Sequence, residues 1–271
     1  MTSPEPKPIP APPGPGLSQP WDPAAPTNAF ERGAGEYTQF RPSYPDEAVA
    51  TVLGNDFEPG QWVADVGAGT GILTAQLLAR GARVRAVEPA AAMRQQFETS
   101  LAAPLARGEV ELLTGSAEHT QIAAQSVRLV AYAQCWHWLD QPRAMVEAAR
   151  ILEPDGRVAI VANQMEVEVP WVHRLTRIMR SGDVYRAEKP PQLGERFTAP
   201  DLHVSHFTTR LRPDAVMALA RTRSSYLRSN AANRVKMQDN LRWYLRDYLG
   251  YGDEDVVEIP YLTLTWTARL R

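Results

Sequence analysis

The sequence predicts an α/β fold, in which helices cover both faces of a largely parallel β-sheet. Short apolar runs alternate with helical patterns between residues 61 and 162. A glycine-rich turn lies between the first apolar run and the helical pattern that follows it. Strands that alternate with helices in this way are typical of parallel sheets, whose strands are joined by helical crossovers.

The individual elements follow from apolar spacing and from residues that start or stop helices. A first helix is expected after Pro45, because Asp46 and Glu47 place negative charge in its first turn, and Gly54 favours its end. We expect strands at 61–66, 83–88, 109–113, 128–133 and 157–162, with helices at 72–80 and 141–152. Asp140 is a good N-cap for the second of these helices, and the Pro-Asp-Gly sequence at 154–156 predicts a turn.

The pattern is looser beyond residue 163. A helix is expected to begin at Pro170, and the polar stretch 189–200 predicts a loop or lid. Two more helices are expected at 213–220 and 232–248. Tyr, Thr and Trp are enriched at 259–266, which predicts a final strand.

Composition limits the possible partners. The 271 residues are 44% hydrophobic, enough for one large domain, and the formal net charge of −2 gives no basic surplus for nucleic acid or an anionic membrane. A small-molecule substrate is therefore favoured. The single cysteine, Cys135, excludes an internal disulfide and is typical of a reducing compartment. No apolar run approaches the roughly 18 residues that span a bilayer and no secretory leader is visible, so a cytoplasmic protein is expected.

Residues 1–28 predict an extended tail. Ten of the 23 prolines fall there, among almost no aliphatic residues. Such a segment cannot bury enough surface to offset the entropy lost on ordering. It is either a dispensable leader or a segment that docks onto a partner.

The strongest chemical indication is the sequence VADVGAGTG at 63–71. Glycines at a strand-to-helix junction let the backbone turn sharply and approach a ligand closely, and the helix amino terminus then faces that ligand. Dinucleotide-binding and S-adenosylmethionine (SAM)-binding folds both use such a turn. A dinucleotide fingerprint that starts at Gly67 needs a small residue at position 72, where this chain has Ile72.

Two acids support the SAM interpretation. Asp65, two residues before Gly67, can accept a hydrogen bond from an ammonium group, which SAM has and a pyrophosphate lacks. Glu88 ends the next expected strand and can accept the ribose hydroxyls of an adenosine cofactor. A solvated charge at the strand end is the alternative interpretation of Glu88.

At these residues the chain resembles the class I SAM-dependent methyltransferases, in particular the methyltransferase type 11 group that includes trans-aconitate methyltransferase-like proteins. The similar segments are 37–45 (YTQFRPSYP), 86–89 (AVEP) with Met93 after it, 116–118 (SAE), 133–138 (AQCWHW), 224–226 (SSY) and 258–261 (EIPY). The resemblance covers residues 30–268.

The resemblance implies a Rossmann-like, seven-stranded, mostly parallel sheet with an antiparallel last strand and a helical cap insertion. SAM is expected across the carboxyl ends of the first, second and fourth strands. The chain then divides into the tail 1–28, a SAM-binding core 29–164, a cap or lid insertion 165–200, and a part 201–271 that completes the sheet and the substrate pocket.

The resemblance also implies a set of cofactor contacts. The glycines line the methionine moiety, Glu88 holds the ribose, Met93 and residues 116–118 border the adenine, and Tyr37 and Arg41 close over the carboxylate. The full set of expected cofactor-binding residues is Tyr37, Arg41, Asp65, Gly67, Ala68, Gly69, Gly71, Glu88, Pro89, Met93, Ser116, Ala117, Glu118 and Gln134. The expected product is S-adenosylhomocysteine.

A sulfonium methyl group is already electrophilic, so the protein must chiefly position the reactants, which contributes about 7–11 kcal/mol. His137 is the best candidate for a general base, because its ordinary pKa suits that role; the alternative is a histidine packed in the wall. Trp136 and Trp138 are candidates for contact with the sulfonium or the acceptor, and core packing is equally favoured for each. Cys135 is interpreted as a packed thiol.

Arginines and histidines elsewhere give weaker indications. Arg174, Arg177 and Arg180 recur at three-residue spacing on the expected cap helix, a row that suits a carboxylated acceptor, although a solvated face is favoured. The same holds for Arg221, Arg223 and Arg228. His203 and His206 lack further ligands at metal spacing, so no metal is expected.

The predicted function is therefore in-line transfer of a methyl group from SAM to a small molecule, with a carboxylate or a specialised metabolite as acceptor. The alternative is a protein that binds SAM for structural or regulatory use without methyl transfer. Residues 134–137 lack the Asn/Asp-Pro-Pro-Tyr type of segment expected of an adenine-N6 enzyme, and Ile72 disfavours an NAD-dependent oxidoreductase. A monomer or homodimer is expected.

Overall fold

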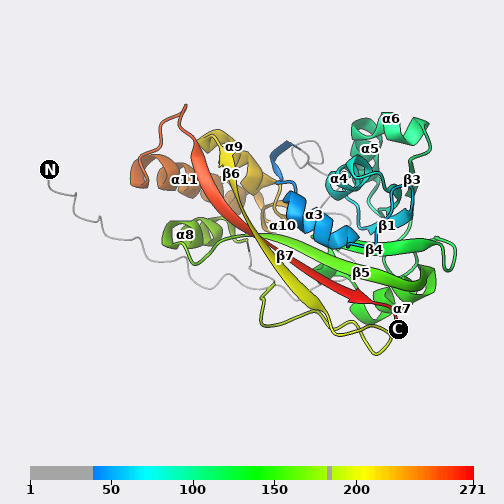
Figure 1. Cartoon of the computed structure of the whole chain (residues 1–271). Coiled ribbons are helices and arrows are strands. Elements are labelled where there is room, and N and C mark those ends of the chain that lie inside the picture. Colours follow the sequence, from blue (N-terminus) through cyan, green and yellow to red (C-terminus); the bar gives the residue numbers. More distant parts are fainter. Residues whose placement is uncertain (1–38, 182–184) are drawn as a thin grey trace.

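The computed structural model describes residues 39–181 and 185–271, so the predicted tail and Tyr37 lie outside the described residues. It confirms the α/β prediction, with a seven-stranded sheet of order β3-β2-β1-β4-β5-β7-β6 (Figure 1). Strands β1 to β5 are mutually parallel, and β7 runs antiparallel between β5 and β6. The predicted antiparallel last strand is therefore confirmed.

The strands are β1 (Trp62–Val66), β2 (Arg83–Val87), β3 (Val110–Leu113), β4 (Val127–Ala133), β5 (Leu152–Met165), β6 (Asp201–Leu211) and β7 (Val257–Arg269). The helices of the core are α3 (Asp46–Leu53), α4 (Ile72–Ala79), α5 (Ala91–Ser100), α6 (Ala102–Ala106), the 3₁₀ turn η1 (Trp136–Trp138) and α7 (Gln141–Ile151). The remaining helices are α8 (Pro170–Met179), α9 (Pro213–Arg221), α10 (Ser224–Leu227), α11 (Ala231–Trp243) and the π-helical turn η2 (Tyr244–Tyr248).

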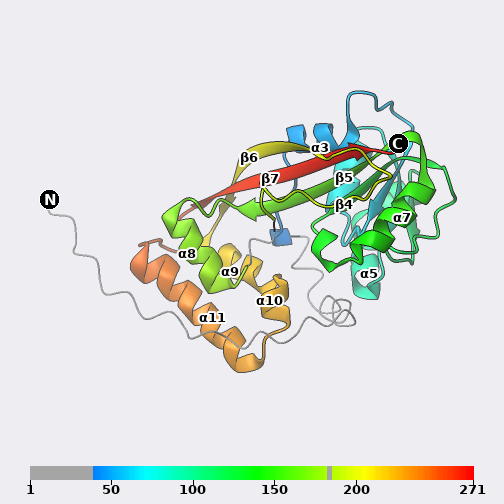
Figure 2. The ribbon, with the colours of Figure 1, turned by 90° about the horizontal axis from the view of Figure 1, so that it is seen from below.

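Helices lie on both faces of the sheet, as Figure 2 shows for α3 and α7. One face is covered by α3, α4 and α5, whose buried side chains include Val52, Leu77 and Phe97. The other face is covered by α7 and by Phe197 from the loop that precedes β6. This two-sided burial explains why the central strands are almost wholly apolar.

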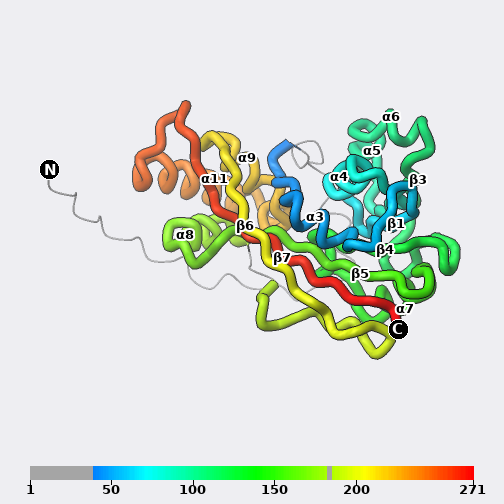
Figure 3. Tube along the Cα trace, viewed as in Figure 1, coloured from blue at the N-terminus to red at the C-terminus, as the bar shows by residue number. Residues whose placement is uncertain are grey.

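A helical lobe is built on the extended ends of the last three strands (Figure 3). Strands β5, β6 and β7 have 14, 11 and 13 residues, whereas β1 to β4 have four to seven. Helices α8, α9 and α11 pack with η2 against Met165, Ile259 and Tyr261 in a separate apolar cluster. Within the described residues of 165–200, α8 is the only helix, so most of the lobe comes from residues 213–248.

The parallel register brings three strand ends to one edge of the sheet. Val66 pairs with Val87, and Asp65 pairs with Ala131 two residues before the end of β4. The residues that directly follow β1, β2 and β4 are therefore neighbours in space. Ligands of open parallel sheets bind at this carboxyl edge.

The structure corrects the sequence predictions at three places. Helices α5 and α6 were not predicted, because only Met93 and Phe97 of α5 are buried and its apolar pattern is weak. The Pro-Asp-Gly sequence at 154–156 lies inside β5, where Asp155 takes a φ of 59° and the pairing with β4 shifts register. The helix expected at 232–248 ends in the π-helical turn η2. None of the described helices is both long and apolar enough to cross a membrane.

Asp140 caps α7 as predicted, because its side chain accepts the backbone N–H of Arg143 at 3.3 Å. We expect Asp140→Ala to lower the free energy of unfolding by about 1 kcal/mol, since one amide of the first helical turn loses its acceptor. Asp140→Asn keeps an acceptor and should cost less than half as much. Urea unfolding of both variants tests this, and equal losses would contradict the capping role.

Candidate active site

The glycine-rich turn after β1 is a left-handed stretch of backbone. Gly67, Gly69 and Gly71 have φ angles of 73°, 58° and 88°, which side-chain-bearing residues rarely adopt. The N–H groups of Gly67 and Ala68 both donate to the carbonyl oxygen of Val87, at 2.8 and 3.1 Å. The turn is thereby tied to the end of β2.

Two of these glycines allow close packing, and the third faces open space. A Cβ atom at Gly67 would lie 2.8 Å from Cys135 Sγ, and one at Gly71 would lie 2.7 Å from Leu101 Cδ1. A Cβ atom at Gly69 would meet nothing within 4 Å. The backbone at Gly69 is therefore the part of the turn that a ligand can approach.

Glu88 stands beside this turn with only 7% of its surface exposed. Its two carboxylate oxygens accept the backbone N–H groups of Gly69 and Ala90, each at 2.8 Å. An ionised carboxylate has about four lone-pair positions, so each oxygen keeps capacity for a hydroxyl donor. The predicted alternative, a solvated charge at the strand end, is wrong because the side chain is buried and bonded.

Asp65 is fully buried at the end of β1. Thr74 Oγ1 donates to its Oδ2 at 2.6 Å, whereas Oδ1 has no hydrogen-bond partner among the described residues. Burial raises the pKa of Asp65 to about 6, and the negative charge of Glu88 adds to this effect. An ammonium group could donate a hydrogen bond to Oδ1 and compensate the buried negative charge.

The residues expected around the adenine divide into two groups. Met93 and Ala117 are 4% and 5% exposed and supply apolar surface at this edge of the sheet. Ser116 exchanges backbone hydrogen bonds of 3.1 Å with His119, and Glu118 accepts the N–H of Asp140 at 3.0 Å. Pro89 is exposed, and its carbonyl oxygen accepts from Arg94.

The segment that leaves β4 turns sharply at Gln134, which has a φ of 61° and donates its side-chain N–H to the Asn163 carbonyl at 2.9 Å. Trp136 is 3% exposed and packs 5.3 Å from the ring of Tyr132. The ring of Trp138 lies 4.7 Å from that of His137.

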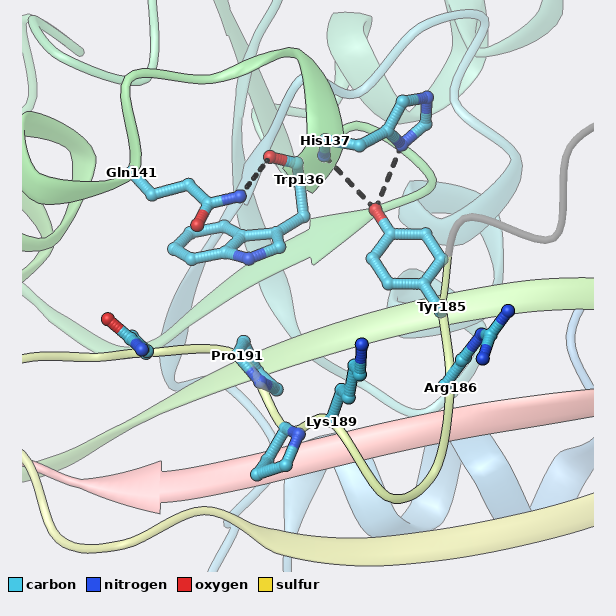
Figure 4. A pocket seen from close by; sticks show the side chains of 9 residues that line it. Trp136, His137, Gln141, Tyr185, Arg186, Lys189 and Pro191 are labelled. Atoms are coloured by element: carbon cyan, nitrogen blue, oxygen red, sulfur yellow. Dashed lines mark hydrogen bonds between the residues drawn. The ribbon is translucent and has the colours of Figure 1, made fainter.

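His137 is held by Tyr185, a residue of the segment before β6. The backbone N–H of His137 donates to the Tyr185 hydroxyl oxygen at 3.1 Å, and His137 Nδ1 lies 3.0 Å from the same oxygen (Figure 4). Burial lowers the pKa of His137 to about 4, and the positive charge of Arg41 contributes. The expectation that this pKa suits a general base is wrong for that reason.

The hydrogen bonds of Tyr185 also assign the His137 tautomer. No other acceptor for the Tyr185 hydroxyl is present among residues 39–181 and 185–271. A Tyr185 hydroxyl that donates to Nδ1 places the ring proton of neutral His137 on Nε2, and we infer this tautomer. Figure 4 shows Nε2 on the side of the ring turned away from Tyr185.

A narrow cavity lies between the glycine-rich turn and the helical lobe. Its volume is about 20 Å³, and its lining consists of Arg41, Pro42, Tyr44, Ile72, Gln134, Asn163, Arg223 and Tyr261. None of these residues is acidic. Arg41 is oriented by Thr222, which accepts from its Nε and Nη2 atoms at 3.0 Å each.

A wide cavity opens on the other side of the segment 134–137. Its volume is about 540 Å³, and its lining consists of Trp136, His137, Gln141, Tyr185, Arg186, Lys189, Pro190, Pro191 and Gln192 (Figure 4). Gln134 lines the narrow cavity, so this short segment separates the two spaces.

The predicted arginine rows do not form common faces. Arg174 lies over the rings of Tyr244 and Tyr248, 5.6 Å from each ring centre, and lines neither of these two cavities. Arg180 ends α8 in a left-handed conformation, away from the helical path. Arg223 precedes α10 and lines the narrow cavity, so its interpretation as part of a solvated face is wrong.

Tyr185 and Asn163 are site residues that the sequence analysis did not assign, and for Arg223 it favoured a solvated face. Asn163 directly follows the strand expected at 157–162, and a polar residue at the carboxyl end of a parallel strand is a signal that could have found it. Tyr185 carries no local signal, because only tertiary contacts bring it to the strand ends. No group of three potential metal ligands occurs within the described ranges.

Comparison with known proteins identifies similar chains. Residues 64–160 match the methyltransferase domain family. An uncharacterised methyltransferase of Mycobacterium tuberculosis is 35% identical over 243 residues, which are 89% of this chain and 96% of that protein.

Two solved structures share the fold. A type II methyltransferase from Anaeromyxobacter dehalogenans has a TM-score of 0.61 at 23% identity, over 85% of this chain and 98% of that one. A phosphoethanolamine N-methyltransferase from Haemonchus contortus, solved with phosphomonomethylethanolamine and S-adenosylhomocysteine, has a TM-score of 0.52 at 14% identity, over 89% of this chain and 57% of that one.

The raised pKa of Asp65 means that this group lowers the stability of the folded state at neutral pH. Because the pKa rises from 3.8 to about 6 on folding, the folded state loses stability from this group as the pH rises through that interval. We expect Asp65→Asn to raise the free energy of unfolding by about 3 kcal/mol at pH 7 and by about half as much at pH 5. Urea unfolding at both pH values measures this, with the exposed Asp239→Asn as control. A loss of stability at pH 7 would contradict the argument.

Proposed function

This chain belongs to the class I SAM-dependent methyltransferases, and from that premise we propose that it methylates a small acidic molecule. The observation that carries the proposal is the narrow cavity, which Arg41 and Arg223 both line and which has no acid among its described lining residues. Ile72 in its wall directly follows Gly71, so the cavity adjoins the glycine-rich turn. Guanidinium groups recognise carboxylates by charge and by paired hydrogen bonds.

We assign the cofactor contacts by the chemistry of each residue. Asp65 Oδ1 is the buried acceptor available to the ammonium group, and Glu88 has lone pairs for the ribose hydroxyls. Gly69 offers open backbone, and Met93 with Ala117 offers apolar surface for the adenine. Arg41 is assigned to the cofactor carboxylate, together with Tyr37, which lies outside the described residues.

When bound, SAM supplies an electrophilic sulfonium methyl group. Arg223 holds the acid group of the acceptor, and the buried Tyr261 and half-buried Gln134 limit the access of water. A carboxylate acceptor is ionised at neutral pH and needs no general base. His137 therefore serves the reaction as a neutral donor, with its Nε2–H available to an oxygen of the acceptor.

A protein that binds SAM without transferring methyl groups is the alternative, and turnover separates the two. We expect isothermal titration to show that Glu88→Ala weakens SAM binding at least about tenfold, because the ribose loses its acceptor. Wild-type protein incubated with cell extract and methyl-labelled SAM should transfer label to small acidic molecules. Binding without transfer would establish the alternative, and failure to bind SAM would contradict both functions.

Substitutions of Arg223 and Arg41 test acceptor binding and cofactor binding separately. We expect Arg223→Gln to retain SAM affinity and to lower label transfer by about 100-fold, as happens when a positioning contact is lost. Arg41→Gln should weaken SAM binding instead. If Arg223→Gln weakened SAM binding as much as Arg41→Gln does, the assignment of Arg223 to the acceptor would be wrong.

The Tyr185 hydroxyl favours neutral His137, because it donates to Nδ1. We expect Tyr185→Phe to raise the pKa of His137 from about 4 to about 5. Nitrogen NMR of labelled histidine reports both this pKa and the protonated ring nitrogen. The exposed His206 serves as control, and a wild-type ring protonated on Nδ1 would refute the assigned tautomer.

A further inference from the structure

We propose that the wide cavity binds a second acidic group of the acceptor, carried on a planar apolar body, so that the acceptor extends across both cavities. This inference rests on the proposed function and names the class of molecule that the site takes. It follows from the sizes of the two cavities, from the charge of the wide one and from their common wall.

The sizes show that the narrow cavity alone cannot hold an acceptor. Its volume of about 20 Å³ admits little more than a water-sized group, because a water needs about 10–15 Å³ on this measure. The wide cavity has about 540 Å³, within the range of small-molecule sites. The body of the acceptor therefore belongs in the wide cavity.

The wide cavity is positively charged. Arg186 and Lys189 are opposed across a tight turn, in which the N–H of Lys189 donates to the Arg186 carbonyl at 3.0 Å. Neither side chain forms an ion pair with any residue of the described ranges, and Glu188 of the same turn does not line the cavity. Figure 4 shows Lys189 pointing into the space below Trp136 and Tyr185. Two adjacent cations without a partner favour an anionic ligand.

Four of the remaining lining residues are aromatic rings or prolines, and the polar His137, Gln141 and Gln192 complete the lining. Trp136 and Tyr185 present aromatic rings, and Pro191 faces them across the cavity (Figure 4). Pro190 also lines the cavity. Tyr185 is fixed by its two contacts with His137, and Gln141 donates to the Trp136 carbonyl at 3.4 Å. Aromatic rings held in place in this way favour a planar ligand, which stacks with little loss of entropy.

The segment 134–137 lines both cavities, so the two spaces are neighbours. Gln134 lines the narrow cavity, whereas Trp136 and His137 line the wide one. The positive charge of Arg41, in the narrow cavity, also lowers the pKa of His137, in the wide one, so the two spaces are close.

The test uses 2-naphthoate as a planar acid and 2-naphthamide as its neutral analogue, titrated into the full chain saturated with S-adenosylhomocysteine. We expect Arg186→Gln/Lys189→Gln to weaken naphthoate binding about tenfold and to leave naphthamide binding unchanged. The control, Arg177→Gln/Lys236→Gln, removes the same charge from exposed positions on α8 and α11 and should bind naphthoate as wild type does.

Equal weakening in both double variants, or no millimolar binding of naphthoate to wild type, would overturn the inference. Unchanged affinity of both variants for S-adenosylhomocysteine verifies that they are folded. Label transfer in extract tests the proposed function separately. If label is transferred while naphthoate fails to bind, only the second subsite is wrong, whereas binding without any transfer leaves the subsite and removes the methyltransferase proposal.

Discussion

The left-handed backbone of Gly67, Gly69 and Gly71 is the constraint on which the site depends. It reverses the chain directly after β1, and the absence of side chains lets Cys135 and Leu101 approach the turn. The N–H groups that the turn exposes are shared between the Val87 carbonyl and the Glu88 carboxylate. Three strand ends are thereby joined through backbone geometry, and Asp65 and Glu88 are buried beside them, where burial raises the pKa of Asp65 to about 6.

The pairing of His137 with Tyr185 joins this core to a segment far along the chain. The two contacts fix one wall of the wide cavity, and the contact with Nδ1 favours the tautomer that is protonated on Nε2. The core strands thus supply the cofactor turn, while residues beyond β5 complete both cavities. Changes in the segment around Tyr185 or in the α9–α10 connection can alter the acceptor without disturbing Gly67–Gly71 or Glu88, which is a physical route to diverse acceptors on one scaffold.

Much of the fold was predictable because burial on both faces of a parallel sheet produces continuous apolar runs. The strands expected at 61–66, 128–133 and 157–162 correspond to β1, β4 and the inner part of β5. Helix α5 was not predicted, because only two of its ten residues are buried and its apolar spacing is therefore weak. The Pro-Asp-Gly sequence at 154–156 predicts a turn, but β5 continues through these residues. Their backbone still forms sheet-like hydrogen bonds, since the N–H of Leu270 donates to the Gly156 carbonyl at 2.8 Å. Sheet pairing there overrides local turn preference.

The sequence by itself determined the family, the cofactor turn and the acids beside it, because those residues are constrained by local backbone geometry and lie within one stretch of chain. Only the tertiary structure decided that Arg223 and not Arg174 lines the narrow cavity, and that Arg186 and Lys189 stand beside Trp136. It also decided the direction of the pKa shift of His137, whose ordinary pKa suits a general base and is lowered to about 4 by burial and by the charge of Arg41. Such properties depend on contacts between distant segments, and no local pattern encodes them.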